Sequence, residues 1–360
     1  MSRIFITASS DATIYEKYAN LNTGHDEILE VGKKQDKLAT SNGKVRSLIK
    51  FTLTDLDGAP TSSEAYLNLK VANATKLNQD ARVYIYPISR SWEEGSGYFD
   101  SDGFFIASSD GATWNVHTSG SNWSGSSDDQ HGAISPAHGA GSDYNFTPMV
   151  SASVTDIRND EIRINVTDIV KPMYSGSGSP ETFTSNYGLL MTFSGSAEAD
   201  INNVGNIKFF SRQTHTVHEP TLELVWLNHS IVTGSLKTLS SLDIEIAPRN
   251  MKAEYNAGSV LKMYFTVRDK YPAKAYANTR RFENRYYLPP SGSIYTIVDA
   301  GSGTTVVPFD DYSHLDCDAT GSYLTLDTKP LYKNRFYELS LKTTLGSEVY
   351  FSRPFRFKVV

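Results

Sequence analysis

The sequence has a single cysteine, Cys317, so no disulfide can form within the chain. Stability must therefore come from packed cores, bound ions or assembly. Long apolar runs are also missing: no stretch approaches the ~20 residues that span a bilayer, and we expect no membrane insertion. Residues 1–7 carry one basic residue and a short apolar run, far from the ~7–15 apolar residues of a secretion signal. We expect a protein made in the cytoplasm that reaches the outside, if at all, by another route.

An excess of positive charge is missing as well. The chain has 34 Lys and Arg against 40 Asp and Glu, a net charge of −6, so no basic stripe is available for phosphates and we expect no nucleic-acid partner. Aromatic residues, in contrast, are plentiful. The 21 Tyr and 17 Phe favour pleated, half-buried surfaces over helices.

Hydrophobic alternation with a period of two dominates the chain, and no long 3.6-residue pattern is present. Residues 45–54, 64–73 and 161–166 each place an apolar set on one face and a polar set on the other. Short strands bounded by Gly, Asn, Asp and Ser predict an all-β fold whose first domain is a jelly-roll β-sandwich. The other strands expected in this domain are 3–7, 11–15, 28–33, 81–89, 187–194, 206–211 and 221–227.

The alternation is interrupted twice. The first interruption is an insertion at about residues 96–160, which is rich in Gly, Ser and Asp. An insertion this long is either functional or disordered. Trp114, Trp123, Tyr144 and Phe146 predict partial order there. The polar stretch 229–242 is interpreted as a linker, which separates a first domain, 1–228, from a second, 243–360.

Alternation resumes in the second domain, at 259–268 and again at the C-terminus. Leu261, Met263, Phe265 and Val267 point one way on the first of these strands. The number of strands suits a domain of roughly 100 residues, and we expect an immunoglobulin-like β-sandwich. Its other strands are expected near 243–248, 282–288, 293–299, 304–308, 322–327 and 335–343.

Short motifs run in a fixed order through residues 10–227. They are Asp11-Ala12-Thr13-Ile14, Asn22-Thr23-Gly24, Leu29-Glu30-Val31-Gly32, Arg46-Ser47-Leu48-Ile49-Lys50-Phe51, Ala65-Tyr66-Leu67-Asn68-Leu69, Ser91-Trp92-Glu93-Glu94-Gly95, Gly111-Ala112-Thr113-Trp114, Asn186-Tyr187-Gly188-Leu189-Leu190, Phe210-Ser211-Arg212-Gln213 and Pro220-Thr221-Leu222-Glu223-Leu224. In this order they resemble the DNRLRE, or disaggregatase-related, domain family. That family is similar to jelly-roll carbohydrate-binding modules, and some members are implicated in binding polysaccharide.

The sequence departs from this family in its long insertion after Trp114, and we expect that, unlike secreted members of the family, it has no signal peptide. A DNRLRE-like domain followed by a β-sandwich looks like virion structural proteins of large contractile-tailed phages. That resemblance implies a bacteriophage tail, neck or capsid-exterior component, located in the virion, whose partners are copies of itself and other virion proteins. The alternative is a polysaccharide-binding or adhesion module that contacts the host cell surface. A polysaccharide-degrading enzyme is the least favoured hypothesis.

No motif marks a catalytic centre. Glu93 and Glu94 are adjacent, and neighbours on a strand face opposite sides, so they cannot act together as acid and base; Asp310-Asp311 has the same problem. His215 and His218 likewise face apart on a strand. His131 and His138 are either solvated loop residues or ligands of an ion. We therefore name no catalytic residue and expect a protein that is not an enzyme.

Three tryptophans are candidates for ligand binding, because sugar rings stack on indole faces. Trp92 and Trp114 fall in the family motifs, and both fit a second interpretation in which they plug one end of the sandwich. Trp123 lies in a Ser/Gly setting and is the better candidate for contact with a ligand or a neighbouring subunit.

Carboxylates supply the candidate metal ligands. Asp11 heads the first family motif and is a possible ligand of structural calcium; Asp316 and Asp318 are weaker candidates. All three could equally serve as turn or capping residues. The second domain also contains an interface-like run rich in Arg and Tyr, the types enriched at protein interfaces. Its residues are Arg280, Arg281, Arg285, Tyr286 and Tyr287.

Overall fold

The chain forms two compact units, each built from β-strands. The N-terminal unit is Phe5–Leu224; the C-terminal unit is Val225–Val360 and includes the first residues, Met1–Ile4. No helix in the part of the chain covered by the structure is long and apolar enough to cross a membrane. The computed structural model describes residues 3–34, 43–54, 60, 63–77, 81–99, 110–124, 143–144, 147–154, 161–175, 185–193, 195–200, 205–271 and 286–360.

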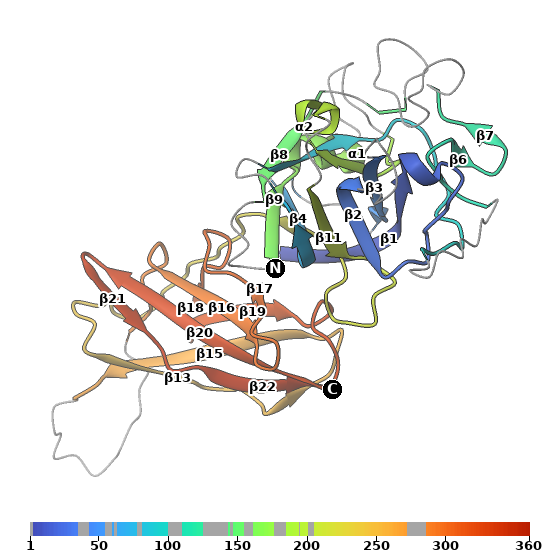
Figure 1. Ribbon diagram of the computed structural model, residues 1–360. Coiled ribbons are helices and arrows are strands. Elements are labelled where there is room, and N and C mark those ends of the chain that lie inside the picture. The colour runs from blue at the N-terminus through green and yellow to red at the C-terminus, as the bar shows by residue number, and fades with distance from the viewer. Residues whose placement is uncertain are drawn as a thin grey trace, which may run out of the picture. The chain divides into compact units, whose positions relative to one another are not determined.

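One large sheet builds the N-terminal unit (Figure 1). Its strands are β1 (Arg3–Tyr15), β2 (Ile28–Lys34), β3 (Gly43–Phe51), β4 (Glu64–Thr75), β5 (Arg82–Pro87), β8 (Val150–Ser153), β9 (Glu161–Asn165), β10 (Leu189–Phe193), β11 (Asn206–Phe210) and β12 (Thr221–Val225). A separate hairpin joins β6 (Val116–Thr118) to β7 (Ser121–Asn122). The two strands expected at 3–7 and 11–15 are one strand, β1, with an irregularity between Ala8 and Ser10.

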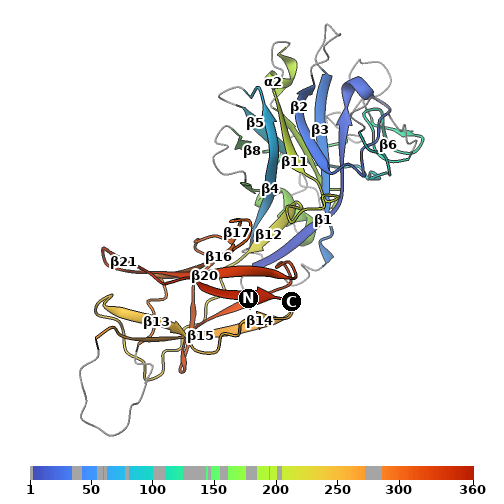
Figure 2. The same cartoon turned by 60° about the horizontal axis from the view of Figure 1, so that its bottom comes forward.

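Pairing in this sheet closes on itself. Strand β1 pairs with both β12 and β3, and the path β1–β12–β4–β11–β2–β3 returns to β1. Closure leaves these six strands without a free edge, which removes the hydrogen-bonding groups that would otherwise invite another chain. Figure 2 shows β2, β3 and β11 side by side in this unit. Together with the C-terminal sandwich described below, this architecture confirms the predicted all-β fold.

Strand β3 is buried on both faces. Val45, Ser47 and Ile49 point to one side and are fully buried, as alternation predicts. Leu48 points to the opposite side and is also fully buried. A second layer of side chains must therefore cover the face that carries Leu48 and Arg46.

The described part of the N-terminal unit also contains three short helical segments: η1 (Glu16–Tyr18), α1 (Thr167–Ser175) and α2 (Gly195–Ala199). The sequence pattern did not predict α1, because it spans few residues and contains Pro172. Asn165 Oδ1 accepts a hydrogen bond from the backbone N–H of Thr167 and starts this helix. Ile169 and Val170 then bury its apolar side.

Two facing sheets build the C-terminal unit (Figure 1). One has the order β13–β15–β19–β18; the other has the order β14–β22–β20–β16–β17, with β21 also paired to β20. All strand pairs within the sheets are antiparallel except β14 with β22. The strands are β13 (Ile244–Pro248), β14 (Glu254–Tyr255), β15 (Val260–Asp269), β16 (Ser293–Asp299), β17 (Thr305–Val307), β18 (Asp316–Asp318), β19 (Gly321–Asp327), β20 (Arg335–Leu345), β21 (Glu348–Phe351) and β22 (Phe355–Val359).

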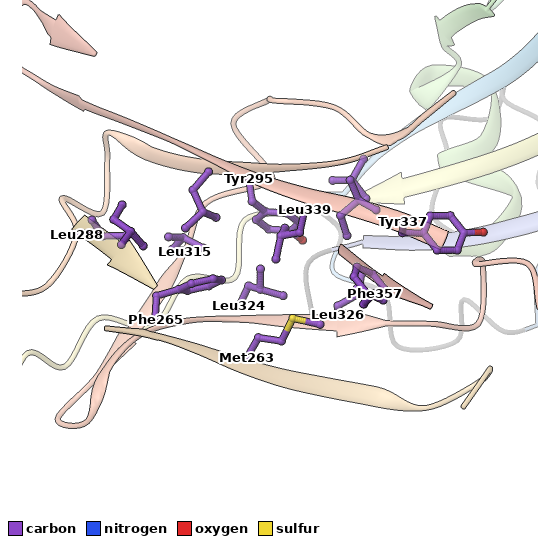
Figure 3. Packing of buried hydrophobic residues seen from close by; sticks show 14 of the residues in the cluster. Met263, Phe265, Leu288, Tyr295, Leu315, Leu324, Leu326, Tyr337, Leu339 and Phe357 are labelled. Atoms are coloured by element: carbon purple, nitrogen blue, oxygen red, sulfur yellow. The ribbon is translucent and has the colours of Figure 1, made fainter. Parts of the chain in front are cut away.

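The core of this unit lies between the two sheets. Figure 3 shows Phe265, Met263 and Leu324 facing Tyr295 and Leu339 from the opposite layer. Of the apolar set predicted on β15, Met263, Phe265 and Val267 are buried and Leu261 is half-buried. Each fully buried apolar side chain contributes about 1.5–3 kcal/mol, so this core stabilises the unit without a disulfide.

The stretch 229–242, interpreted from the sequence as a linker, is hydrogen-bonded to the C-terminal unit. The backbone N–H of Val232 donates to the carbonyl of Cys317, and the N–H of Cys317 donates to the carbonyl of Ser230. Residues 230–232 thus run parallel to β18 as an extra edge segment. Further along, the N–H of Tyr287 donates to the carbonyl of Lys237.

Candidate functional site

A layer of aromatic side chains covers the outer face of β3. Ala12 and Ile14 of β1, Leu48 of β3, Leu190 of β10 and Tyr86 of β5 line this face. Onto it pack Ile88, Trp92, Ala112, Trp114, Trp123 and Tyr144, several of them from the insertion. The insertion therefore builds a second small core, which we call the tryptophan layer.

The three tryptophans predicted to bind a ligand all lie inside this layer. Trp123 is only 1% exposed, and its Nε1–H donates to the carbonyl of Thr113 at 2.9 Å. Trp92 is also buried and donates its Nε1–H to the carbonyl of Tyr187 at 2.7 Å. Trp114 is buried as well and belongs to the same cluster. A sugar ring needs an exposed indole face, so these rings act as packing residues here, in a layer on the face of β3.

The correction for Trp123 has a local cause. The β6–β7 hairpin turns at Gly120, where φ is 76°, and this turn folds Trp123 back under the preceding strand. Its ring then lies 5.4 Å from that of His117. The Ser/Gly setting that suggested exposure instead supplies a tight turn.

Replacement of Trp123 by Phe is expected to lower the free energy of unfolding by about 1–3 kcal/mol, because the buried Thr113 carbonyl loses its donor while most of the ring volume remains. Urea denaturation, monitored by the circular dichroism of the backbone, measures the change in the free energy of unfolding. Tyr98→Phe, at a side chain that is 43% exposed, serves as the control and should leave the midpoint unchanged. If Trp123→Phe has the same urea midpoint as the wild type, the result contradicts a stabilising hydrogen bond from Trp123 to the Thr113 carbonyl.

A buried carboxylate anchors both sides of the stretch 125–142, which lies outside the described residues. Asp143 is fully buried, and its Oδ1 lies 2.7 Å from Nε of Arg90. Ser124 donates its backbone N–H to Oδ2 and its hydroxyl to Oδ1 of the same carboxylate. A charge this deep requires such partners. Trp123 and Tyr144, the neighbours of Ser124 and Asp143, are thereby held on the sheet.

A second buried ion pair supports the tryptophan layer. Arg46 of β3 donates from Nε and Nη2 to the two carboxylate oxygens of Glu198 at 3.0 and 2.7 Å. The guanidinium carbon of Arg46 also lies 5.3 Å from the centre of the Trp114 ring. The sequence pattern placed Arg46 on the polar face of its strand but could not indicate Glu198, which is distant in the chain.

The side-chain amide of Asn22 joins three loops. Its Nδ2 donates to the carbonyls of Glu94 and Ala112, and its Oδ1 accepts from the backbone N–H groups of Gly24 and Gly97. The side chain is fully buried, so all four of its hydrogen bonds form away from water. We call this arrangement the Asn22 hub.

Glycines allow the loops to reach the hub. Gly95 and Gly111 have φ of 77° and 90°, and a Cβ on either would collide with the hub backbone or with Asn22 itself. Only glycine adopts such a backbone without strain. Gly95 ends one of the family motifs noted in the sequence and Gly111 begins another, and the structure supplies the physical reason for both glycines.

Asp11 lies beside the hub and binds protein groups. Its Oδ2 accepts the backbone N–H of Arg212 at 2.7 Å, and its own N–H donates to Oε1 of Glu94. The Arg212 guanidinium pairs with that Glu94 carboxylate at 2.8 Å. Burial raises the pKa of Asp11 to about 7, and the nearby Glu94 charge adds to the effect.

These contacts differ from the predicted calcium site. Calcium takes about 6–8 oxygen ligands, whereas Glu94 is paired with Arg212 and Asp11 caps a backbone N–H. Among the residues that the structure describes, no group of three or more His, Cys, Asp or Glu could hold a metal ion. Asp11 instead ties β1 to the loop that contains Arg212.

Asp316 and Asp318 also bind protein groups. Asp316 Oδ1 accepts the N–H of Ser230. Asp318 Oδ2 accepts from Tyr264 and from Lys262 at 2.7 and 3.0 Å. Hydrogen bonds from these two groups lower the pKa of Asp318 to about 2, against the opposing effect of burial.

The remaining predicted residues do not form one site. Arg280, Arg281 and Arg285 lie outside the described residues, as do His131 and His138. Tyr286 and Tyr287 are half-buried; the Tyr286 hydroxyl donates to Asp269 and the Tyr287 backbone bonds Lys237. The His215 side chain is 90% exposed beside Glu27, whereas the ring of His218 packs on Phe210.

An aromatic surface borders the hub. Tyr18 and Phe99 are half-buried, with ring centres 5.7 Å apart, and Tyr98 next to them is 43% exposed. The Asn22 hub fixes this loop, because Gly97 bonds both Asn22 and His25. Nearby, the exposed Asn20 accepts a hydrogen bond from Nδ2 of Asn115 at 2.9 Å.

Such a surface has the chemistry of a sugar-binding patch. Aromatic rings offer apolar faces to the CH groups of a sugar, and side-chain amides offer both donors and acceptors to its hydroxyls. The sequence signal for it was weak, since Tyr18, Asn20, Tyr98 and Phe99 belong to no motif. We call Tyr18, Asn20, Tyr98, Phe99 and Asn115 the aromatic–amide surface.

Comparisons with known proteins agree with this chemistry in part. The model of carbohydrate-binding module family 96 matches residues 3–97. The N-terminal domain of the Streptococcus gordonii adhesin Sgo0707 aligns at 10% identity, covering 88% of this chain and 60% of that one, with a TM-score of 0.14, too low to support a shared fold. No curated protein matches the sequence. The first part of the chain thus contains a β domain like a carbohydrate-binding module.

Proposed function

We propose that this chain binds polysaccharide through the aromatic–amide surface and catalyses no reaction. The match of residues 3–97 to a carbohydrate-binding module carries the proposal. Tyr18 and Asn20 fall within the matched residues, and Tyr98 and Phe99 follow directly. The buried Asn22 hub and tryptophan layer hold this surface in place, which lowers the entropy cost of binding.

Affinity electrophoresis in gels that contain single polysaccharides tests the proposal. The wild-type chain is expected to be retarded by at least one neutral or acidic polysaccharide. Tyr98→Ala and Asn20→Ala should each weaken retardation on the order of tenfold, a loss of about 1.4 kcal/mol. Asn73→Ala, exposed on β4, is the matched control and should bind as the wild type does. Binding that both surface variants retain in full would place the ligand elsewhere.

A reducing-sugar assay on the same polysaccharides separates binding from hydrolysis. Of the carboxylates weighed from the sequence, Glu94 is paired with Arg212 and Asp310 with Arg3. The proposal expects no product above background. Sustained product release would revive the enzyme hypothesis.

We infer further that the chain serves as a structural component of a tailed-phage virion, as its resemblance to DNRLRE-containing virion proteins suggests. Exposed apolar residues on the C-terminal unit support an assembly role. Phe351 is 60% exposed and Val349 is 49% exposed on β21, and Phe309 packs edge-to-face against Phe351 at 6.2 Å. Exposed apolar groupings often mark interaction sites. Detection of the chain in purified particles by mass spectrometry tests this; a protein that remains monomeric and absent from particles argues against it.

A further inference from the structure

Two histidines of the C-terminal unit lie together beside β18. The ring centres of His229 and His314 are 5.2 Å apart, and the ring planes are nearly perpendicular, at 82°. Within the described residues, Nε2 of His229 and Nδ1 of His314 are buried and have no hydrogen-bond partner. Buried polar atoms normally have a partner, so an unpaired one indicates a missing ligand, water or ion.

The spacing of the rings suits a shared metal ion. Zinc binds imidazole nitrogen at about 2.0–2.1 Å, and two imidazoles on one tetrahedral ion hold their ring centres about 5–6 Å apart. The separation of His229 and His314 falls in that interval. Neutral imidazole is a preferred ligand of zinc, nickel, cobalt and copper.

Asp316 lies on the Nδ1 side of the first of these rings. Its Oδ1 lies 3.8 Å from Nδ1 of His229 and also accepts the backbone N–H of Ser230. A carboxylate on the Nδ1 side favours the proton there and leaves the lone pair on Nε2. This is the nitrogen that is buried without a partner.

We propose that His229 and His314 bind a divalent transition-metal ion, zinc being the reference, with Asp316 as the positioning residue. Among the residues that the structure describes, no third His, Cys, Asp or Glu joins them, so water completes the coordination. The ion links the segment before residues 230–232 to the chain that enters β18. The ion therefore holds this edge segment on the sheet, in addition to the backbone hydrogen bonds that Cys317 makes with Ser230 and Val232.

Isothermal titration of the full chain with zinc ion, after chelator treatment and buffer exchange, tests the site. We expect saturable binding with a component of one ion per chain, and a rise in the unfolding temperature of the C-terminal unit. His229→Gln and His314→Gln should each weaken that component more than about tenfold, and Asp316→Asn about tenfold. Asn at position 316 keeps an acceptor for Ser230, so it separates positioning of His229 from the backbone contact.

Two controls make the result specific. His215→Gln alters a side chain that is 90% exposed and should leave the component unchanged. Cys317→Ser removes the neighbouring thiol, which is buried, and should also leave it unchanged. The proposal is overturned if the wild type shows no saturable zinc binding, or if His229→Gln and His314→Gln both bind as the wild type does. A variant that fails to fold is detected by circular dichroism, and the remaining histidine variant then decides.

Discussion

Asn22→Asp is expected to destabilise the N-terminal unit by more than about 3 kcal/mol, the combined cost of leaving two buried carbonyls without donors and burying a charge. The substitution keeps the shape of the side chain but replaces its Nδ2 by oxygen. That oxygen would face the carbonyls of Glu94 and Ala112, which the amide now binds at 2.7 and 2.8 Å. Protonation of the new carboxyl could restore only one donor.

Guanidinium or urea unfolding monitored by circular dichroism measures this effect. Asn20→Asp provides a matched control two residues away, because Asn20 is exposed and its amide oxygen accepts a surface hydrogen bond from Asn115. The control should lie within about 0.5 kcal/mol of the wild type. Comparable stability of the two variants would show that the Asn22 hub does not hold the loops together. Asn22→Asp should also lose its retardation by polysaccharide gels, because the Asn22 hub fixes Gly97 beside Tyr98.

Asp11→Asn is expected to change how stability depends on pH. Burial raises the pKa of Asp11 from 3.8 to about 7, so between these values the folded chain holds a proton that the unfolded chain has released. Stability from this group is fully present below pH 3.8 and is lost as pH rises through about 7. A shift of this size corresponds to at most about 4 kcal/mol.

Asparagine is neutral at every pH and can still accept the N–H of Arg212. The variant should therefore be more stable than the wild type at pH 8 and should lose the advantage as pH falls toward 5. Unfolding free energies at pH 5, 6, 7 and 8 measure the difference. Asp168→Asn, at an exposed carboxylate of α1, is the control. Its free energy of unfolding should change with pH in the same way as that of the wild type. If the free energies of unfolding of the wild type and of Asp11→Asn change in parallel from pH 5 to pH 8, Asp11 is ionised in the folded chain at all four pH values.

The local pattern of the sequence predicted most strands. On β15, alternation identified Met263, Phe265 and Val267 as one face, and these residues are buried between the sheets. On β3, Val45 and Ile49 were predicted to share a face in the same way. Such predictions succeed because side chains two residues apart on a strand share a face wherever the strand lies.

The candidate site depended on contacts that sequence spacing does not record. Asn22 reaches loops near residues 94 and 112, and Arg46 meets Glu198, each across a large separation in the chain. Trp123 looked exposed because its neighbours are small and polar, yet the hairpin turn at Gly120 buries it. These features depend on which loops meet in the folded chain.

By itself the sequence determined the class of fold, the positions of most strands and the absence of internal disulfides, because each follows from local alternation or from composition. Only the tertiary structure decided that the tryptophans form a packed layer, that Asp11 holds a backbone N–H, and that His229 meets His314. Whether a side chain is buried, and which group it contacts, depends on segments that are distant in the sequence and meet only in the folded chain. The free energy of a buried polar group is set by its neighbours in space, whichever residues adjoin it in the chain.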